Sequence, residues 1–191
     1  MEEIKKRTEV INGFLAGECN AMYVQTTAES VSLQIRKILE LIALASLAAN
    51  QSEYAKHRRH FYKDWNAKRI LETLKKVNPK FYPTPNRQVV DQESDKVVSL
   101  EEITSGFLTE NEFITLFNNC NEILHADNPF SRTQNPQAFL ASVPAWMEQI
   151  RILLNHHTIQ LIDEDKQLWV MMKAKSDGKA HVYEFERIPA D

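Results

Sequence analysis

The stretch from Thr27 to Asn50 constrains the fold more than any other part of the chain. Apolar residues recur in it at three- and four-residue steps, which predicts an α-helix with a buried face. Additional leucines and alanines make its second half apolar on nearly every side, and a helix of that kind lies at the centre of its domain. We therefore expect a helical bundle built around this helix. Its only strong charges lie toward the N-terminal half, at Glu29, Arg36, Lys37 and Glu40.

Further helices are expected from the same periodicity, and the period changes near the C-terminus. From Thr158 onward apolar residues alternate, which predicts three short strands joined by turns. The sequence thus predicts a mainly α fold, with residues 1–157 as a helical bundle. Residues 158–191 are expected to form a small three-stranded antiparallel β-meander that packs on the bundle in one compact unit. The expected helices are residues 3–15, 52–62, 65–77, 110–125 and 136–156, the strands are residues 158–162, 168–174 and 180–187, and a short hairpin is expected within residues 87–98.

The composition suits one soluble domain. The chain has 191 residues, of which 43% are hydrophobic and 26% charged, enough for a sizeable core. Cys19 and Cys120 lie far apart, and Cys120 falls on an apolar helix face, so we expect a buried thiol and a reducing compartment. No secretory signal is visible, and the longest apolar run, Ile38–Ala49, is too short to cross a bilayer. These features predict a cytoplasmic protein without a membrane partner.

Charge is distributed unevenly along a chain whose net charge is −3. Residues 56–87 hold ten basic and two acidic residues, a net charge of +8, whereas residues 88–131 hold nine acidic residues and one basic, a net charge of −8. A basic segment can bind an anionic partner, and it can equally be neutralised by packing against the acidic segment. We slightly favour neutralisation, because the two segments adjoin in the sequence.

The segment LTENEFITLFNNCNEILHADNPF, residues 108–130, predicts a helix with a defined start and end. Thr109 and Glu112 have the spacing of a capping box, and Pro129 prevents the helix from continuing. Between them, apolar residues recur at helical steps and form one face that we expect to be buried. They are Phe113, Leu116, Phe117, Cys120, Ile123 and Leu124.

A polar row runs along the same helix beside its apolar face. Asn118, Asn121 and His125 recur at i, i+3 and i+7 and therefore project from one side, with Glu122 next to them. A helix C-terminus favours a protonated imidazole, which suits a general acid or an anion contact. The alternative is structural: His125 bonds a carbonyl near the helix end, and the asparagines bond a neighbouring loop.

The long apolar second helix, followed later by a helix ending in a polar row and a histidine, resembles the HEPN superfamily (higher eukaryote and prokaryote nucleotide-binding domains). The segments EILHADNPF and DWNAKRILETLKKVNPKFYPTP look like those of a widespread bacterial family, and the resemblance covers most of residues 20–158. Active members of the superfamily carry an arginine, usually followed by a polar residue, and the histidine four to six positions later. This pair, often contributed across a dimer, cleaves RNA without a metal by promoting attack of the 2′-hydroxyl. The resemblance implies RNA or a nucleotide as ligand, and a homodimer.

His125 matches the histidine of that motif, but the arginine is missing. Positions 118–120, where it should lie, hold two asparagines and a cysteine, none of them cationic. This departure argues against cleavage, because the guanidinium is the group that would hold and neutralise the scissile phosphate. Arg36 of the central helix or Arg69 could replace it only if the fold brought one of them close.

Residues 56–80 form a second candidate site, because basic side chains there alternate with aromatic ones, a combination that suits single-stranded nucleic acid. The candidate RNA contacts are Arg58, Arg59, Lys63 and Arg69, together with Arg36. The more frequent arrangement at helical spacing is a solvated basic face whose aromatic residues point into the core. The aromatic residues in and just after the run are Phe61, Tyr62, Trp65, Phe81 and Tyr82.

Two histidine pairs are the only hint of a metal site. His57 and His60 are one helical step apart, and His156 and His157 are adjacent. A convincing site needs third and fourth ligands, and the sequence has no CxxC, HExxH or acidic calcium loop. Its four glycines never cluster, which excludes a phosphate-binding glycine loop. We therefore expect neither a metal nor another cofactor.

Three functional hypotheses follow. The first is a HEPN-like module that binds RNA or a nucleotide, or mediates a protein interaction, and whose nuclease motif is degenerate because it lacks the arginine. The second is a metal-independent endoribonuclease of a bacterial defence or toxin system, in which His125 is the acid/base and Asn118, Asn121 and Glu122 complete the site. The third is a structural scaffold without a ligand.

Overall fold

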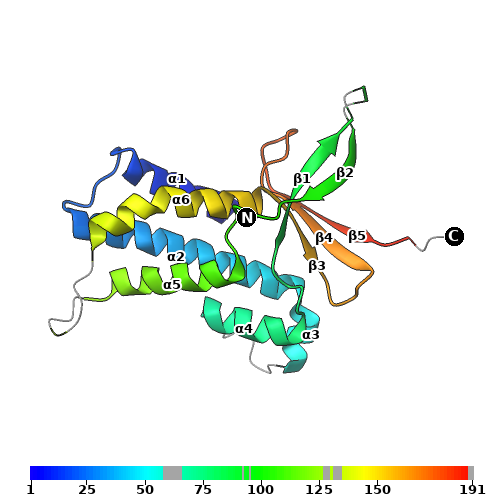
Figure 1. The fold of residues 1–191 in the computed structure, drawn as a ribbon, viewed down its shortest axis with the longest axis horizontal. Helices are drawn as coiled ribbons and strands as arrows, with labels where there is room; N and C mark the ends of the chain where they lie inside the picture. Colours follow the sequence, from blue (N-terminus) through cyan, green and yellow to red (C-terminus); the bar gives the residue numbers. More distant parts are fainter. Residues whose placement is uncertain (58–65, 92, 95, 127–129, 131–134, 189–191) are drawn as a thin grey trace.

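The computed structural model describes residues 1–57, 66–91, 93–94, 96–126, 130 and 135–188. Over these residues the chain forms six α-helices and five β-strands, with the helices gathered in a bundle and the sheet at one end of it (Figure 1). The elements in chain order are α1 (Glu2–Leu15), α2 (Val24–Ala49), α3 (Gln51–His57), α4 (Ala67–Val77), β1 (Thr84–Val90), β2 (Val97–Glu102), α5 (Glu110–Leu124), α6 (Pro136–Asn155), β3 (His156–Gln160), β4 (Lys166–Met171) and β5 (His181–Glu186).

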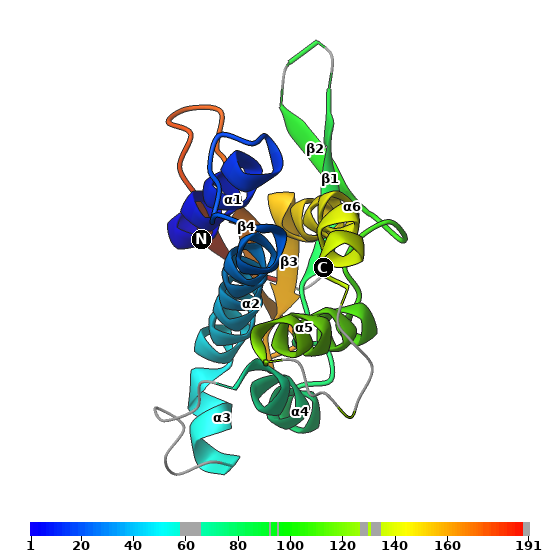
Figure 2. The same cartoon turned by 90° about the vertical axis from the view of Figure 1, so that its left-hand side faces the viewer.

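Helix α2 is the centre of the bundle, which confirms the prediction from its sequence. Helices α1, α4, α5 and α6 all contact it, and a view along the bundle shows them arranged around it (Figure 2). Burial of one large aliphatic side chain stabilises a fold by about 1.5–3 kcal/mol, so α2 supplies a large part of the driving force for folding. Its fully buried aliphatic side chains are Ala28, Val31, Ile35, Ile38, Leu39 and Ala43.

The five strands form one antiparallel sheet in the order β2-β1-β3-β4-β5. Strands β3, β4 and β5 are the expected meander, and β1 and β2 are the expected hairpin. The expectation of a mainly helical protein with only a three-stranded sheet is nevertheless wrong. The hairpin joins the meander because Thr84 pairs with Thr158 and Pro85 with His157. The fold is therefore mixed α and β.

Helix α6 leads directly into the sheet. The helix ends at Asn155 and β3 begins at His156, with no linker between them. The N–H of Met172, just after β4, donates to the carbonyl oxygen of Asn155 over 3.0 Å and closes this junction. The sheet thus draws strands from residues 84–102 as well as from the C-terminal segment. A division into residues 1–157 and 158–191 stays a prediction.

A buried amide ties the helices to the sheet. Asn78, which follows α4, donates from Nδ2 to Oδ1 of Asn50 (2.9 Å) and to the carbonyl oxygen of Gln160 in β3 (2.8 Å). Its own Oδ1 accepts the N–H of Lys80 over 3.0 Å. Buried polar groups are tolerated when they are hydrogen-bonded in this way. Asn78 therefore fixes the end of α4 against both the end of α2 and the sheet.

Candidate functional site

Helix α5 begins and is oriented as its sequence predicts. The Thr109 hydroxyl accepts the N–H of Glu112, and the Glu112 carboxylate accepts the N–H of Thr109 over 2.8 Å, so the capping box is confirmed. The apolar face packs toward α2, where the hydroxyl of Ser32 donates to the carbonyl oxygen of Cys120 over 2.9 Å. Its buried residues are Phe113, Leu116, Phe117, Cys120 and Ile123.

The polar row of α5 lies at the surface. Asn118, Glu122 and His125 are exposed, and Asn121 is half-buried. His125 is the C-cap of the helix, and its backbone N–H donates to the carbonyl oxygen of Glu122 over 3.2 Å. A ligand can therefore reach the imidazole from solvent.

Arg36 lies beside α5, which its position in the sequence could not reveal. The Cζ atom of its guanidinium is 5.6 Å from the centre of the Phe117 ring, a cation–π arrangement. Burial raises the pKa of the Cys120 thiol to about 12, and the charge of Arg36 is close enough to oppose that shift. An arginine from α2 therefore stands beside the turn of α5 that contains Phe117 and Cys120.

A buried carboxylate holds Arg36 in this place. Arg36 Nε lies 3.2 Å from Oε1 of Glu40, and Lys37 Nζ lies 2.8 Å from Oε2 of the same group. Glu40 is only 8% exposed, so its charge requires these partners. Two cations share one anion, so the cluster keeps one net positive charge, and its arginine lies against Phe117 of α5.

The spacing along α5 separates Arg36 from His125. His125 lies eight residues after Phe117, which the guanidinium contacts, so at 1.5 Å per residue the two levels are about 12 Å apart along the axis. A guanidinium and an imidazole that act on one phosphate must both lie within hydrogen-bonding distance of it. The arrangement suits two contacts to different parts of a ligand better than joint action on one group.

Arg69 does not complete the row on α5. It lies exposed in the first turn of α4, where its backbone N–H donates to the side chain of Asn66 over 3.1 Å. Helix α4 buries Ala67, Ile70 and Leu74 and turns its lysines to solvent, which is the solvated-face arrangement. The remaining predicted RNA contacts, Arg58, Arg59 and Lys63, lie outside the described residues, as do Phe61, Tyr62 and Trp65.

The aromatic residues just after the basic run belong to the core. Phe81 is fully buried, and the hydroxyl of Tyr82 donates to the carbonyl oxygen of Leu108 over 2.8 Å. Tyr82 meets both Phe81 and Phe113 edge to face. These two rings therefore cannot serve as the stacking platforms for bases that the sequence had suggested.

The basic and acidic segments partly neutralise each other. Lys75 on α4 pairs with Glu110 at the start of α5 over 3.0 Å, and Arg87 on β1 pairs with Glu101 on β2. Both pairs join the basic residues 56–87 to the acidic residues 88–131. They support the interpretation that the charge asymmetry is at least partly internal.

The adjacent pair His156 and His157 is not a metal site. Successive residues of a strand point to opposite faces, so the two rings diverge from β3. Burial lowers the pKa of both rings, that of His157 to about 4. For the pair His57 and His60, His60 lies outside the described residues. Among the residues that are described, no group of three or more His, Cys, Asp or Glu side chains comes together to hold a metal.

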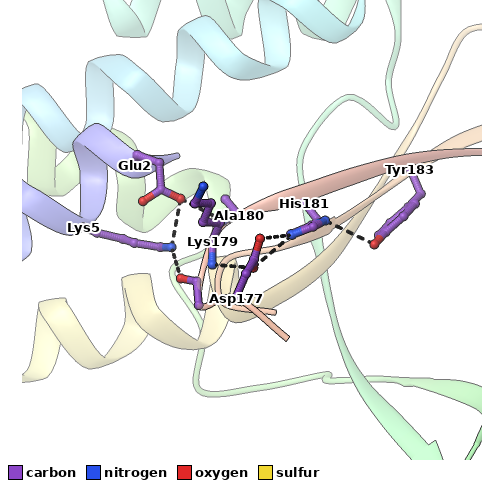
Figure 3. A network of polar contacts seen from close by, with 8 residues as sticks. Glu2, Lys5, Asp177, Lys179, Ala180, His181 and Tyr183 are labelled. Atoms are coloured by element: carbon purple, nitrogen blue, oxygen red, sulfur yellow. Dashed lines mark hydrogen bonds and ion pairs between the residues drawn. The ribbon is translucent and has the colours of Figure 1, made fainter. Parts of the chain in front are cut away.

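A network of polar contacts joins α1 to the connection between β4 and β5 (Figure 3). The Glu2 carboxylate accepts the N–H of Ala180 (2.8 Å) and Nζ of Lys5 (3.0 Å), and Lys5 also donates to the carbonyl oxygen of Gly178 (3.0 Å). The hydrogen bond from Ala180, followed by that from Lys5, lowers the pKa of Glu2. No local sequence pattern predicts this contact between the two ends of the chain.

The same network contains an Asp–His–Tyr line. Nε2 of His181 lies 3.1 Å from both carboxylate oxygens of Asp177, and its Nδ1 faces the Tyr183 hydroxyl at 3.3 Å (Figure 3). Asp177 also accepts the N–H of Lys179 over 2.9 Å. The Asp177 carboxylate thus contacts both the backbone of the turn before β5 and the imidazole of His181. We therefore assign the Asp177, His181 and Tyr183 contacts a structural role. The i, i+2 spacing of His181 and Tyr183 on a strand would have revealed their shared face.

Comparisons of the chain with protein-family models, with curated proteins and with solved structures gave no match. None of the helices in the described part of the chain is long and apolar enough to span a bilayer. Function is therefore inferred from the geometry of the described residues.

Proposed function

We propose that the chain is a HEPN-like module that binds single-stranded RNA along the exposed face of α5 and does not cleave it. One observation carries the proposal: Arg36 of α2, with its net positive cluster, lies beside the helix that presents His125 and the two amides. Arginine and histidine bind phosphate, and amides bond base edges or sugar hydroxyls. The α5 face thus offers the groups that an RNA strand requires.

Separation of the two basic groups favours binding over cleavage. Successive phosphates of a stacked strand advance by about 3.4 Å, so levels about 12 Å apart reach different phosphates of one strand. Arg36 is also held by Glu40 and by the Phe117 ring, which keeps its guanidinium away from the end of α5. An endoribonuclease that uses His125 remains the alternative, favoured by the exposure of that ring.

Binding is tested by fluorescence anisotropy with a short labelled single-stranded RNA at several salt concentrations. Arg36→Gln should weaken binding several-fold and reduce the salt slope by about one phosphate contact. Glu40 keeps Lys37 as its partner in this variant, so the fold should persist. Arg187→Gln, which removes an exposed arginine just after β5, is the matched control. Equal losses in both variants would show nonspecific attraction and refute the site.

Cleavage is tested on the same RNA in the presence of EDTA. We expect the RNA to remain intact with the wild-type protein. Cleavage that persists in EDTA and disappears in a folded His125→Ala variant would establish the endoribonuclease instead. Absence of both binding and cleavage would leave only the hypothesis of a structural scaffold without a ligand. Charge reversal at Arg58, Arg59 and Lys63 separately tests the basic segment, and a sedimentation experiment tests the homodimer that the resemblance implies.

A further inference from the structure

A hollow of about 400 Å³ opens where the C-terminal end of α6 meets β1 and the end of β4. It lies away from α5, which contributes no residue to its lining. Its volume falls within the range of small-molecule sites, which run from about 300 to 1,000 Å³. The described residues that line it include four cations and no acid. The cations are Arg87, Arg151, Lys173 and Lys175.

These four cations leave an excess of positive charge at the hollow. Arg151 is held by Glu148 through two bonds of 2.7 and 2.6 Å, and Arg87 is held by Glu101. Within the described part of the chain, neither Lys173 nor Lys175 forms an ion pair, and both are exposed. The arginines are therefore positioned by their carboxylates, while two lysine charges remain for an anion from solution.

A buried histidine, whose ring meets that of Trp169 edge to face, also lines the hollow. His156 lines it, is only 6% exposed, and has no hydrogen-bond partner at Nδ1 or Nε2 among the described residues. Leaving one buried polar group unsatisfied costs about 1–3 kcal/mol, so this ring has a hydrogen-bonding capacity that the fold leaves unused. Burial lowers the pKa of His156, and a backbone interaction with Asn86 opposes this shift. The neutral ring offers one donor and one acceptor.

Amide side chains complete the lining. Asn86 and Gln88 of β1 and Asn155 of α6 lie beside His156 around the hollow. Amides and a neutral imidazole bond the uncharged polar groups of a ligand, such as hydroxyls or ring nitrogens, whereas lysine and arginine bond its anionic group. The lining thus has groups that can bind both the anionic part and the uncharged polar part of one small molecule.

A larger neighbouring hollow, about 650 Å³ between α1 and α6, is a poorer site for an anion. It shares Arg151, Asn155 and Lys173 with the first and adds Lys5 and Lys6, but two acids, Glu2 and Glu9, also line it. Carboxylates that line a hollow repel an anionic group bound in it. The smaller hollow is therefore where the positive charge is uncompensated.

We propose that the smaller hollow binds a phosphorylated small molecule of about nucleotide size, whose phosphate contacts Arg151, Lys173 and Lys175 and whose uncharged part contacts His156 and the amides. Planar guanidinium and flexible ammonium groups are the usual protein partners of phosphate. This site is independent of the RNA face on α5, because the two use different elements.

The test is isothermal titration of the full chain with AMP and with pyrophosphate, together with the ring resonances of His156 in NMR spectra. We expect binding of AMP, of pyrophosphate or of both, at one molecule per chain. Lys173→Gln/Lys175→Gln should weaken it by about tenfold or more. Lys68→Gln/Lys76→Gln on α4, which removes the same charge from exposed positions outside the hollow, should leave the affinity within about twofold. AMP should also shift the His156 resonances.

Three results would overturn the proposal. One is absence of binding by both probes, and another is equal weakening in the two double variants, which would indicate attraction to net charge alone. The third is binding of RNA, but of neither probe, that is lost in Lys173→Gln/Lys175→Gln, which would make the hollow part of a polymer site. Arg36→Gln should leave AMP binding unchanged, so failure of the RNA proposal would not affect this one.

Discussion

Acidification should destabilise the fold through one buried ring, His157. Its Nδ1 lies 3.0 Å from the carbonyl oxygen of Leu154, so the neutral ring carries its hydrogen on Nδ1 and donates it there. The other nitrogen, Nε2, is buried and has no hydrogen-bond partner among the described residues. A second proton would place an unpaired charge in the interior. Burial therefore lowers the pKa of His157 from 6.5 to about 4.

The direction of the effect follows from which state binds the proton. The unfolded chain takes up this proton below about pH 6.5, whereas the folded chain does so only below about pH 4. The contribution of His157 to stability is therefore complete above pH 6.5 and is lost as the pH falls toward 4. Since one pKa unit corresponds to about 1.4 kcal/mol, the full loss is roughly 3 kcal/mol, and the loss at pH 5 is about 2 kcal/mol. Domains of this kind are stable by about 5–15 kcal/mol, so the loss is measurable.

Urea unfolding at pH 8 and pH 5 measures this effect. His157→Asn is the informative variant, because its amide can still donate to the Leu154 carbonyl but does not titrate. The wild-type protein should lose about 2 kcal/mol more than His157→Asn between the two pH values. The reasoning fails if wild type and His157→Asn lose equal stability, because His156 is present in both and cannot account for a difference.

Three other substitutions test the packing and the helix start. Thr109→Ala should lower the free energy of unfolding by about 1 kcal/mol, because it removes the capping box, and the urea midpoint should fall accordingly. An unchanged midpoint would show that the N-terminus of α5 is fixed by packing alone. Asn78→Ala should lower the free energy of unfolding by about 2–3 kcal/mol, because it leaves buried groups of Asn50 and Gln160 without their partner. A loss no larger than that caused by Asn111→Ala, at an exposed position, would contradict this. Phe81→Ala should cost about 3–5 kcal/mol and lower Tm by about 10 °C in calorimetry, whereas an unchanged Tm would place this ring outside the core.

The helices could be predicted because their signals are local. Apolar periodicity identified α2 as central, and the Thr109 and Glu112 pair located the start of α5 to the residue. The sheet was underestimated because its strand pairing is not local. The pairing of β1 with β3 joins segments separated by α5 and α6, and no local pattern records it. The outer strand β2 is mostly exposed, so it lacks a strong alternation of apolar residues.

For the candidate sites too, features set by local spacing could be predicted, and features set by packing between distant elements could not. The prediction of an exposed imidazole at the end of a helix is met, because His125 is the exposed C-cap of α5, whereas the shared side of Asn118, Asn121 and His125 stays a prediction. Position in the sequence could not tell that Arg36 lies against Phe117, because that contact depends on how α2 and α5 pack. Burial of His156 and His157 was equally invisible, since two adjacent histidines in a strand look the same whether they are buried or exposed.

The bonds from Glu2 and Lys5 to residues 178 and 180 bear on how the chain matures on the ribosome. A helix forms within about a microsecond, whereas translation at about 5–20 residues per second needs roughly 10–40 seconds for a chain of this length. Among the described elements, α1 is translated before the others and is one of the last to acquire all its partners. Until residues 178–186 are translated, the first turn of α1 lacks these partners and the edge of β4 that pairs with β5 is open to association with a neighbouring chain.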